Sequence, residues 1–143
     1  NKIKIIIESN LFNLPLLRKT IRGVCSTVVK DEKIFEDIEL SLNEALTNVI
    51  YYAYQNEPDH EIQITVNLND NEVVFQIIDE GVLNTKSSFD PLKVNAKKNL
   101  DNFNIEEIAE SGRGLFLIHQ LMDEVHFSTV NNKNCLVLKK RFK

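Results

Sequence analysis

The chain has 143 residues, and its shares of hydrophobic (43%) and charged (27%) residues are those of one globular domain with its own core. A formal net charge of −4 argues against a protein held mainly by nucleic-acid phosphates or by an anionic membrane surface. No apolar run approaches the roughly 20 residues that a membrane-spanning helix needs, and no signal peptide is visible. Cys25 and Cys135 are far apart, and neither they nor the three histidines have the spacing of metal ligands. We therefore expect a reduced, cytoplasmic protein of one domain, residues 1–143, without direct nucleic-acid or membrane partners.

The first half of the sequence predicts one strand and two helices. β-Branched residues dominate residues 2–8, which is typical of a strand. Apolar residues then recur at helical spacing over residues 11–30, and again from about residue 36 to residue 55. The polar residues 31–35 predict a break between these helices, and Pro58 lies in the segment that ends the second one.

The second half predicts two hairpins and a third helix. Residues 62–68 and 73–78 have the pattern of two strands joined by a turn. Residues 115–122 carry an apolar stripe at helical spacing, and residues 125–142 predict a final hairpin with its turn at residues 131–134. These elements predict an α+β fold, in which three helices cover one face of a mixed, mainly antiparallel sheet.

A long segment without strong periodicity, residues 82–111, separates the two hairpins. Roughly 30 residues is long for a connection inside a compact domain, and such segments are usually lids, binding loops or disordered. We expect a lid here.

The second predicted helix presents two polar side chains next to each other. Glu44 and Asn48 lie one turn apart on the same side, away from the apolar stripe that includes Leu42, Ala45 and Leu46. A carboxylate beside an amide oxygen can hold a hydrated divalent cation and orient a proton acceptor. Taken alone, the same pattern is typical of a solvent-exposed helix face.

Two further motifs follow in a fixed order. Asp79-x-Gly81 ends the strand of residues 73–78, and Gly112-x-Gly114 opens the third helix. An aspartate at a strand end can accept a hydrogen bond from an exocyclic amine, and a glycine beside it lets a ring approach the backbone. Glycines at a helix N-terminus expose amides and the positive end of the helix dipole, which suits phosphate. Each motif alone is weak, and neither is a Rossmann fingerprint or a P-loop.

The order and spacing of these motifs closely resemble those of the GHKL superfamily of ATP-binding domains, which includes gyrase, heat-shock chaperones, histidine kinases and mismatch-repair proteins. Within it, the chain is most similar to the small anti-sigma-factor serine/threonine kinases of the bacterial stress and sporulation type. The strings that carry the resemblance are Asn43-Glu44-Ala45-Leu46-Thr47-Asn48, Asp79-Glu80-Gly81, Gly112-Arg113-Gly114-Leu115 and Leu121-Met122-Asp123-Glu124-Val125. The resemblance implies a Bergerat-type two-layer sandwich with an ATP lid.

The resemblance also implies a role for each motif. Glu44 is expected to be the catalytic general base, Asn48 the Mg²⁺ ligand, and Asp79 the residue that reads adenine. Four further residues are expected to bind the nucleotide. Gly81 is expected to shape the base pocket, and three residues are expected to lie around the phosphates: Gly112, Arg113 and Gly114.

The implied reaction is transfer of the ATP γ-phosphoryl group to a serine or threonine of an antagonist protein, in alternation with binding of a sigma factor. A homodimer through the first strand and helix is implied in the same way. One alternative is a catalytically weak or inactive ATP-binding module that sequesters a partner protein. Another is the ATP-binding half of a histidine kinase, which would need a separate phosphoacceptor helix.

Several positions depart from the pattern of that family, and they motivate the inactive alternative. Leu83 stands where a second glycine is common, and Tyr52-Ala53-Tyr54 replaces a histidine-containing triplet. Glu110 stands where some relatives have arginine, and Asn134-Cys135 replaces a Gly-Thr pair. Ser88-Phe89-Asp90-Pro91 supplies a Phe-Asp-Pro motif after a longer insertion.

Overall fold

The computed structural model describes residues 1–82 and 110–143. The predicted lid, residues 82–111, therefore falls almost entirely outside the described residues, as do Leu83 and the Phe-Asp-Pro motif. In the described part of the chain, no helix is both long enough and apolar enough to cross a membrane.

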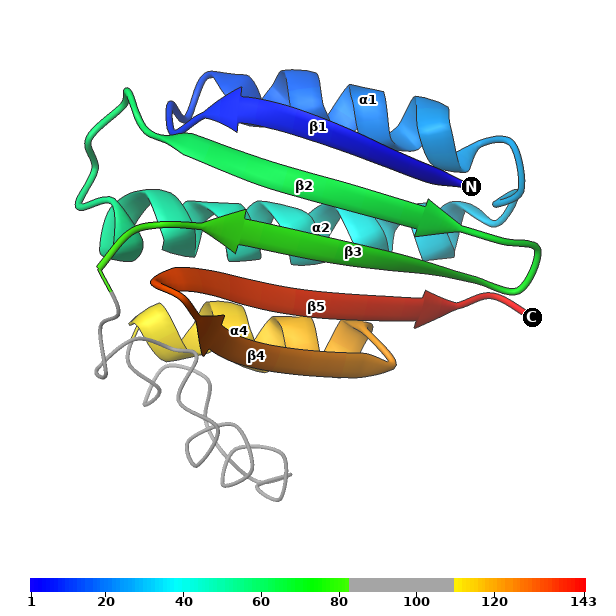
Figure 1. Cartoon of the computed structure of the whole chain (residues 1–143). Helices are drawn as coiled ribbons and strands as arrows, with labels where there is room; N and C mark the ends of the chain where they lie inside the picture. The colour runs from blue at the N-terminus through cyan, green and yellow to red at the C-terminus, as the bar shows by residue number, and fades with distance from the viewer. Residues whose placement is uncertain (83–109) are drawn as a thin grey trace.

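A five-stranded sheet forms one layer of the molecule, and all of its strand pairs are antiparallel (Figure 1). Its spatial order is β1-β2-β3-β5-β4, so β1 and β4 are the edge strands. The strands are β1 (Lys2–Glu8), β2 (Glu61–Leu68), β3 (Glu72–Asp79), β4 (Glu124–Val130) and β5 (Lys133–Arg141). The predicted α+β fold is confirmed, and the described sheet is wholly antiparallel rather than mixed.

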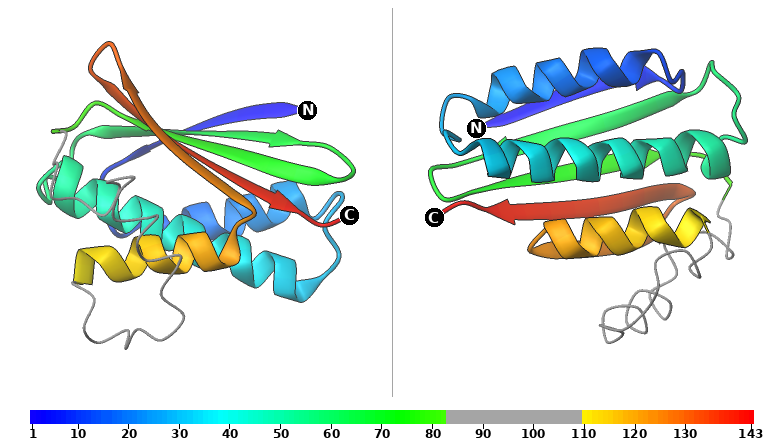
Figure 2. Two further views of the ribbon diagram at one scale, coloured as in Figure 1. Left: turned by 90° about the horizontal axis from the view of Figure 1, so that it is seen from below. Right: turned by 180° about the vertical axis from the view of Figure 1, so that it is seen from behind.

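The helices form the second layer and cover one face of the sheet (Figure 2). They are α1 (Asn13–Cys25), α2 (Glu32–Asn48), the short π-helix η1 (Val49–Ala53) and α4 (Glu110–Leu121). The middle helix α2 packs against both α1 and α4. Its C-terminal end, the end of β3 and the start of α4 all lie at the left end of the molecule in Figure 1.

The start of α2 corrects one prediction. Residues 31–35, which we expected to be a break, contain the N-cap and first turn of this helix. The Asp31 side chain accepts a hydrogen bond from the Lys33 amide at 2.8 Å, which is typical N-cap chemistry. Phe35 is buried and extends the apolar stripe of α2 toward its N-terminus. The charged residues in this stretch are therefore the solvent face of the first turn.

The other end of α2 continues into η1, whose π-type geometry differs from the plain helix predicted to residue 55. The Tyr54 amide donates to the Val49 carbonyl at 2.9 Å, a five-residue step. Gln55 and Asn56 then take positive φ values of 53° and 62°, which turns the chain toward β2. Single π-helical turns are frequent at functional sites.

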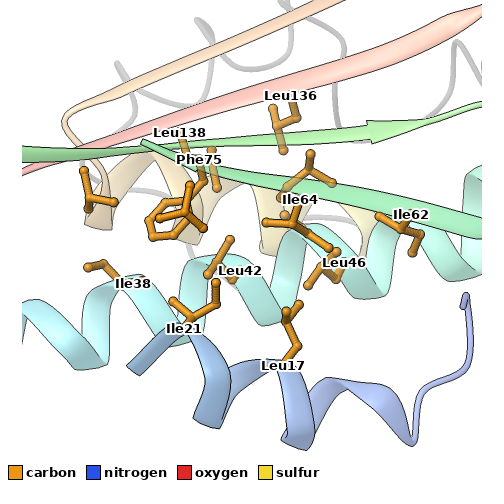
Figure 3. Close-up of a cluster of buried hydrophobic side chains, with 14 of the residues drawn as sticks. Leu17, Ile21, Ile38, Leu42, Leu46, Ile62, Ile64, Phe75, Leu136 and Leu138 are labelled. Atoms are coloured by element: carbon orange, nitrogen blue, oxygen red, sulfur yellow. The ribbon is translucent and has the colours of Figure 1, made fainter. Parts of the chain in front are cut away.

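The core lies between the sheet and the helices, where alternate residues of the strands meet the apolar faces of α1 and α2 (Figure 3). The contributing side chains are largely enclosed and are mostly branched aliphatic residues, together with Phe35 and Phe75. They include Leu17, Ile21, Ile38, Leu42, Leu46, Ile62, Ile64, Phe75, Leu136 and Leu138. Burial of these side chains holds α2 firmly against the sheet.

A buried ion pair ties the C-terminal end of α4 to α2 and β5. The Lys140 Nζ donates to the Asp37 carboxylate at 3.0 Å and to the Leu121 carbonyl at 2.6 Å. Lys33, one turn before Asp37, approaches the same carboxylate at 2.9 Å. Burial raises the pKa of Asp37, but the two lysines outweigh it and the net shift is downward. These contacts fix the position of α4 along α2 at the end opposite its glycines.

Candidate functional site

The predicted pair on α2 meets the predicted glycine on α4. A Cβ atom placed on Gly114 would lie 2.9 Å from Glu44 Oε2 and 3.3 Å from Asn48 Nδ2. The backbone of α4 therefore runs directly against both polar side chains, and a glycine leaves them room in the positions that they occupy. Asn48 is buried, whereas Glu44 is half-buried.

The glycine pair opens a helix, as the sequence predicted, and its two members lie in different turns of α4. Because α4 begins at Glu110, Gly112 lies in its first turn and Gly114 in its second. The first four amides of a helix have no acceptor within it, so the Gly112 amide belongs to the group that can bind an anion. Gly114 instead provides space for Glu44 and Asn48. The Arg113 side chain lies outside the described part, and its predicted role stays a prediction.

Asp79 occupies the end of β3 and is only 6% exposed. Its Oδ1 accepts two hydrogen bonds, from the Gly81 amide at 2.9 Å and from Asn134 Nδ2 at 2.8 Å. Burial raises the pKa of Asp79, and the hydrogen bonds from Asn134 and Gly81 act in the opposite direction. The carboxylate is thus held in one orientation in a site that is poor in solvent.

Gly81 contacts the helical layer rather than leaving an open surface. A Cβ atom there would lie 2.4 Å from the Ala53 carbonyl oxygen, and the Val82 amide donates to that carbonyl at 2.8 Å. Nearby, the Tyr54 hydroxyl accepts from the Glu80 amide at 2.9 Å and donates to the Glu61 carbonyl at 2.6 Å. Close packing of the strand end against η1 is therefore the observed reason for a glycine at position 81.

One continuous helical segment, from Glu44 to Ala53, joins the two parts of the site. Its C-terminal end contacts Gly81, and its N-terminal end lies against Gly114. At 1.5 Å per residue, the segment spans about 13 Å. A buried acceptor thus stands at one end and a carboxylate with an amide at the other, which can bind an elongated ligand with an amine and an anionic group.

The oxygen donors at the α4 end fit a magnesium ion. Glu44 contributes a carboxylate and Asn48 an amide oxygen, and Mg²⁺ prefers such hard oxygen ligands with several retained waters. Glycine at position 114 keeps a side chain out of the space beside them. The role of Asn48 as the Mg²⁺ ligand stays a prediction.

Asn134 is the residue of this site that the sequence analysis did not assign. It was placed in the turn of the final hairpin, but it lies in β5, directly opposite Asp79 in the pairing of β3 with β5. The turn proper is formed by Asn131 and Asn132, whose φ values of 53° and 63° are typical of a two-residue hairpin loop. The adjacent pair Asn131-Asn132 is a common sequence for a two-residue hairpin turn. This signal could have ended the turn at Asn132 and placed Asn134 in the strand.

A second group of potential metal ligands lies in the connection between η1 and β2. Ligand atoms of Glu57, Asp59 and His60 lie within 4.8 Å of one another. The two acidic residues are exposed, His60 Nε2 is 2.7 Å from Glu57, and the His60 ring stacks on Tyr54 at 4.6 Å. This hydrogen bond and the stacking account for the group as part of the surface beside the site.

Comparison with known proteins agrees with this geometry. The pattern of the histidine kinase-like ATPase domain family matches residues 7–140. The serine-protein kinase RsbW of Bacillus cereus (strain AH820) is 29% identical over 128 residues, covering 87% of this chain and 75% of the relative. RsbW of Bacillus thuringiensis (strain Al Hakam) is 31% identical over 128 residues with the same coverage.

A solved structure has the same fold. The crystal structure of the RsbU and RsbW domains of a Mycobacterium tuberculosis protein aligns with a TM-score of 0.64 and 14% identity. The alignment covers 99% of this chain and 32% of that one, so this chain spans about a third of the solved protein. The chain belongs to the histidine kinase-like ATPase domain family and is, within it, similar to the RsbW serine-protein kinases.

Proposed function

We propose that this protein is a Mg²⁺- and ATP-dependent serine/threonine kinase that acts in the bacterial cytoplasm as an anti-sigma, partner-switching regulator. Its substrate would be a serine or threonine of an antagonist protein, and its other partner a sigma factor. The observation that carries the proposal is the contact of Gly114 with both Glu44 and Asn48. It brings a proton acceptor and an amide oxygen to the start of a helix whose free amides suit phosphate. Similarity to the RsbW serine-protein kinases supports the choice of a protein hydroxyl as the acceptor.

At the base end, Asp79 would accept a hydrogen bond from the exocyclic amine of adenine. Its Oδ1 is occupied by Gly81 and Asn134, and Oδ2 accepts none from the described residues. A charged acceptor in a poorly solvated site makes a stronger hydrogen bond than the same group in water. Asp79 would thereby select the base and set the depth of the nucleotide.

At the phosphate end, the Gly112 amide would donate to a phosphate oxygen and Asn48 Oδ1 would hold the metal. Bound magnesium neutralises charge on the phosphate oxygens during transfer. Glu44 would accept the proton of the attacking hydroxyl as a new oxygen–phosphorus bond forms, and the bond to the β–γ bridging oxygen breaks to release ADP. The half-exposed position of Glu44 leaves it accessible to a hydroxyl on another protein.

Incubation of the protein with γ-labelled ATP and candidate antagonist proteins tests this proposal. The parent protein should label a serine or threonine, and Glu44→Ala should lower the transfer rate by roughly 10²- to 10⁴-fold, the usual contribution of a general base. Glu36→Ala, an exposed glutamate on the same helix, is the matched control and should transfer at the parent rate. ATP binding without any labelled residue would instead support a module that sequesters its partner.

A homodimer through β1 and α1 is part of the same proposal. The three most exposed large apolar side chains of this region are Phe12 at 86%, Leu16 at 65% and Ile6 at 59%. Exposed apolar surface of this kind often marks a protein interface. Sedimentation should show a dimer in the parent and a weakened dimer in Phe12→Ser. A parent that stays monomeric at about 100 μM, where a dimer with a Kd near 1 μM would be almost fully formed, would contradict the proposal.

A further inference from the structure

Asn134 makes three hydrogen bonds at the end of β3, and it is only 5% exposed. Its Nδ2 donates to Asp79 Oδ1 at 2.8 Å and to the Gly81 carbonyl at 3.2 Å. Its Oδ1 accepts from the Thr129 hydroxyl across the hairpin at 3.1 Å. Rotating the amide by half a turn would place its oxygen against two other acceptors, the Asp79 carboxylate and the Gly81 carbonyl. These two acceptors therefore fix which side of the Asn134 amide carries Nδ2.

The consequence for Asp79 is that its two oxygens become unequal. Oδ1 receives one donor from β5 and one from the Gly81 amide, and two donors are an ordinary complement for a carboxylate oxygen. Oδ2 receives none within residues 1–82 and 110–143. In this part of the chain, Ser41 Oγ is the one side-chain polar atom that is fully enclosed and has no hydrogen bond. Oδ2 also has no hydrogen bond there, so it must keep some solvent contact.

We propose that Asn134 is a positioning residue for base selection, which commits Asp79 Oδ1 to the protein and leaves Oδ2 as the acceptor for the exocyclic amine of the base. The proposal rests on the proposed role of Asp79 in nucleotide binding. Asn134 itself need not touch the nucleotide. Its side chain would act by holding the carboxylate in one rotamer before the base arrives.

The described residues around Asp79 offer no replacement for this donor. Among them, the titratable groups that its charge reaches are Tyr54, at the end of η1, and Cys135, beside Asn134 on β5. Both have raised pKa values, so both are neutral near pH 7. The adjacent Glu80 is 3.8 Å from Lys133, and in the described residues no salt bridge reaches Asp79. Loss of the Asn134 amide would therefore leave Oδ1 with the Gly81 amide as its donor and make the charged form of Asp79 less favourable.

Calorimetric titration with two nucleotides tests the inference. ATP is compared with purine riboside triphosphate, which lacks the exocyclic amine and is otherwise the same. The parent should prefer ATP by roughly 10- to 100-fold, the usual range for a hydrogen bond to a charged group. In Asn134→Leu, this preference should fall to about threefold or less, because the variant loses affinity for ATP. Its affinity for the analogue should stay within about threefold of the parental value.

Two further measurements separate positioning from general support of the fold. In Asn134→Leu, the pH at which ATP affinity declines should move upward, and affinity for the analogue should show no such shift. Thr129→Val removes the hydroxyl that orients the amide, and Thr129 is exposed, so this variant should fold even if Asn134→Leu does not. Its preference for ATP should fall by about two- to fivefold, within the range of one neutral hydrogen bond.

Equal loss of affinity for both nucleotides, or an unchanged preference in both variants, would overturn the inference. The proposed function fails in a different way. If Asp79→Asn retained the full preference for ATP, or if the parent bound neither nucleotide, the base-reading role of Asp79 would be wrong. If Asp79→Asn lost the preference and Asn134→Leu kept it, only the role of Asn134 would be wrong.

Discussion

The two carboxylates of the site are held in opposite ways. Asp79 is buried at a strand end, and two hydrogen bonds fix one of its oxygens. Glu44 is half-buried on a helix, beside Gly114, and accepts no hydrogen bond from the residues that the structure describes. One acid is immobilised by its neighbours, and the other keeps the freedom of a long side chain.

This difference fits the two tasks that we propose. Recognition of a base gains from an acceptor that is oriented in advance, since less freedom is lost on binding. A general base must reach a proton on an incoming protein, and catalytic hydrogen bonds often tighten only in the complex. The comparison therefore predicts that changes at the Asp79 end act on ATP affinity, and changes at the Glu44 end act on phosphotransfer.

Asp79→Asn should have the largest effect on binding, a loss of roughly 100- to 1000-fold in ATP affinity. An asparagine amide cannot accept donors from Asn134, Gly81 and the base at the same time, so at least one buried polar group stays unpaired. Calorimetry measures the affinity, and Glu80→Gln, an exposed neighbour, is the control. Binding of ATP at parental strength would show that Asp79 does not read the base.

Gly81→Ala should come next, with a loss of about 2–3 kcal/mol in the free energy of unfolding, typical of overpacking. The added Cβ would lie 2.4 Å from the Ala53 carbonyl, and backbone on both sides must move. Urea denaturation measures the change. Stability within 0.5 kcal/mol of the parent, roughly the limit for a surface substitution, would mean that η1 yields easily at this contact.

Gly114→Ala should leave stability within about 1 kcal/mol and reduce phosphotransfer by roughly tenfold. Alanine is the better helix former by about 1 kcal/mol, and the nearest atom to its Cβ is the end of the flexible Glu44 side chain. That side chain can move aside, but it then leaves its place beside Asn48. We expect Gly81→Ala to lose stability and Gly114→Ala to lose phosphotransfer. A Gly114→Ala variant that lost stability but kept its transfer rate would contradict this contrast.

The smallest effect concerns pH. Burial raises the pKa of Asp79, and its charged form is the acceptor for the base, so ATP affinity should fall by up to about tenfold per pH unit as the pH drops through that raised pKa. The contribution of Asp79 to the free energy of unfolding has the opposite pH dependence. Because its pKa is raised in the folded protein, protonated Asp79 stabilises the fold at low pH, and this stabilisation is lost as the pH rises through the raised pKa. ATP titrations at pH values from 8 down to about 4, close to the ordinary aspartate pKa of about 3.9, should show this decline on the acid side in the parent. Asp79→Asn should lack it.

The sequence predicted the strands and the shared side of Glu44 and Asn48 because alternation and helical spacing are local signals. It misjudged the start of α2, where Asp31 looked like part of a polar break and is the helix cap. It also placed Asn134 in a turn. The partnership of Asn134 with Asp79 depends on a pairing between strands 55 residues apart, which local patterns do not encode.

The π-helical turn after Asn48 carries a consequence for the length of the chain. A π turn holds one more residue than the α-helical turn that it replaces. Deleting one residue between Asn48 and Ala53 would convert this turn into an α-helical one and leave the positions on either side facing as before, whereas one more residue would rotate every later position by about 100°. Such an insertion would take the Ala53 carbonyl away from Gly81 and the Val82 amide, although no residue in either part of the site had been altered. This segment should therefore accept the loss of one residue more readily than the gain of one, because its residue count sets the relative placement of the two acids.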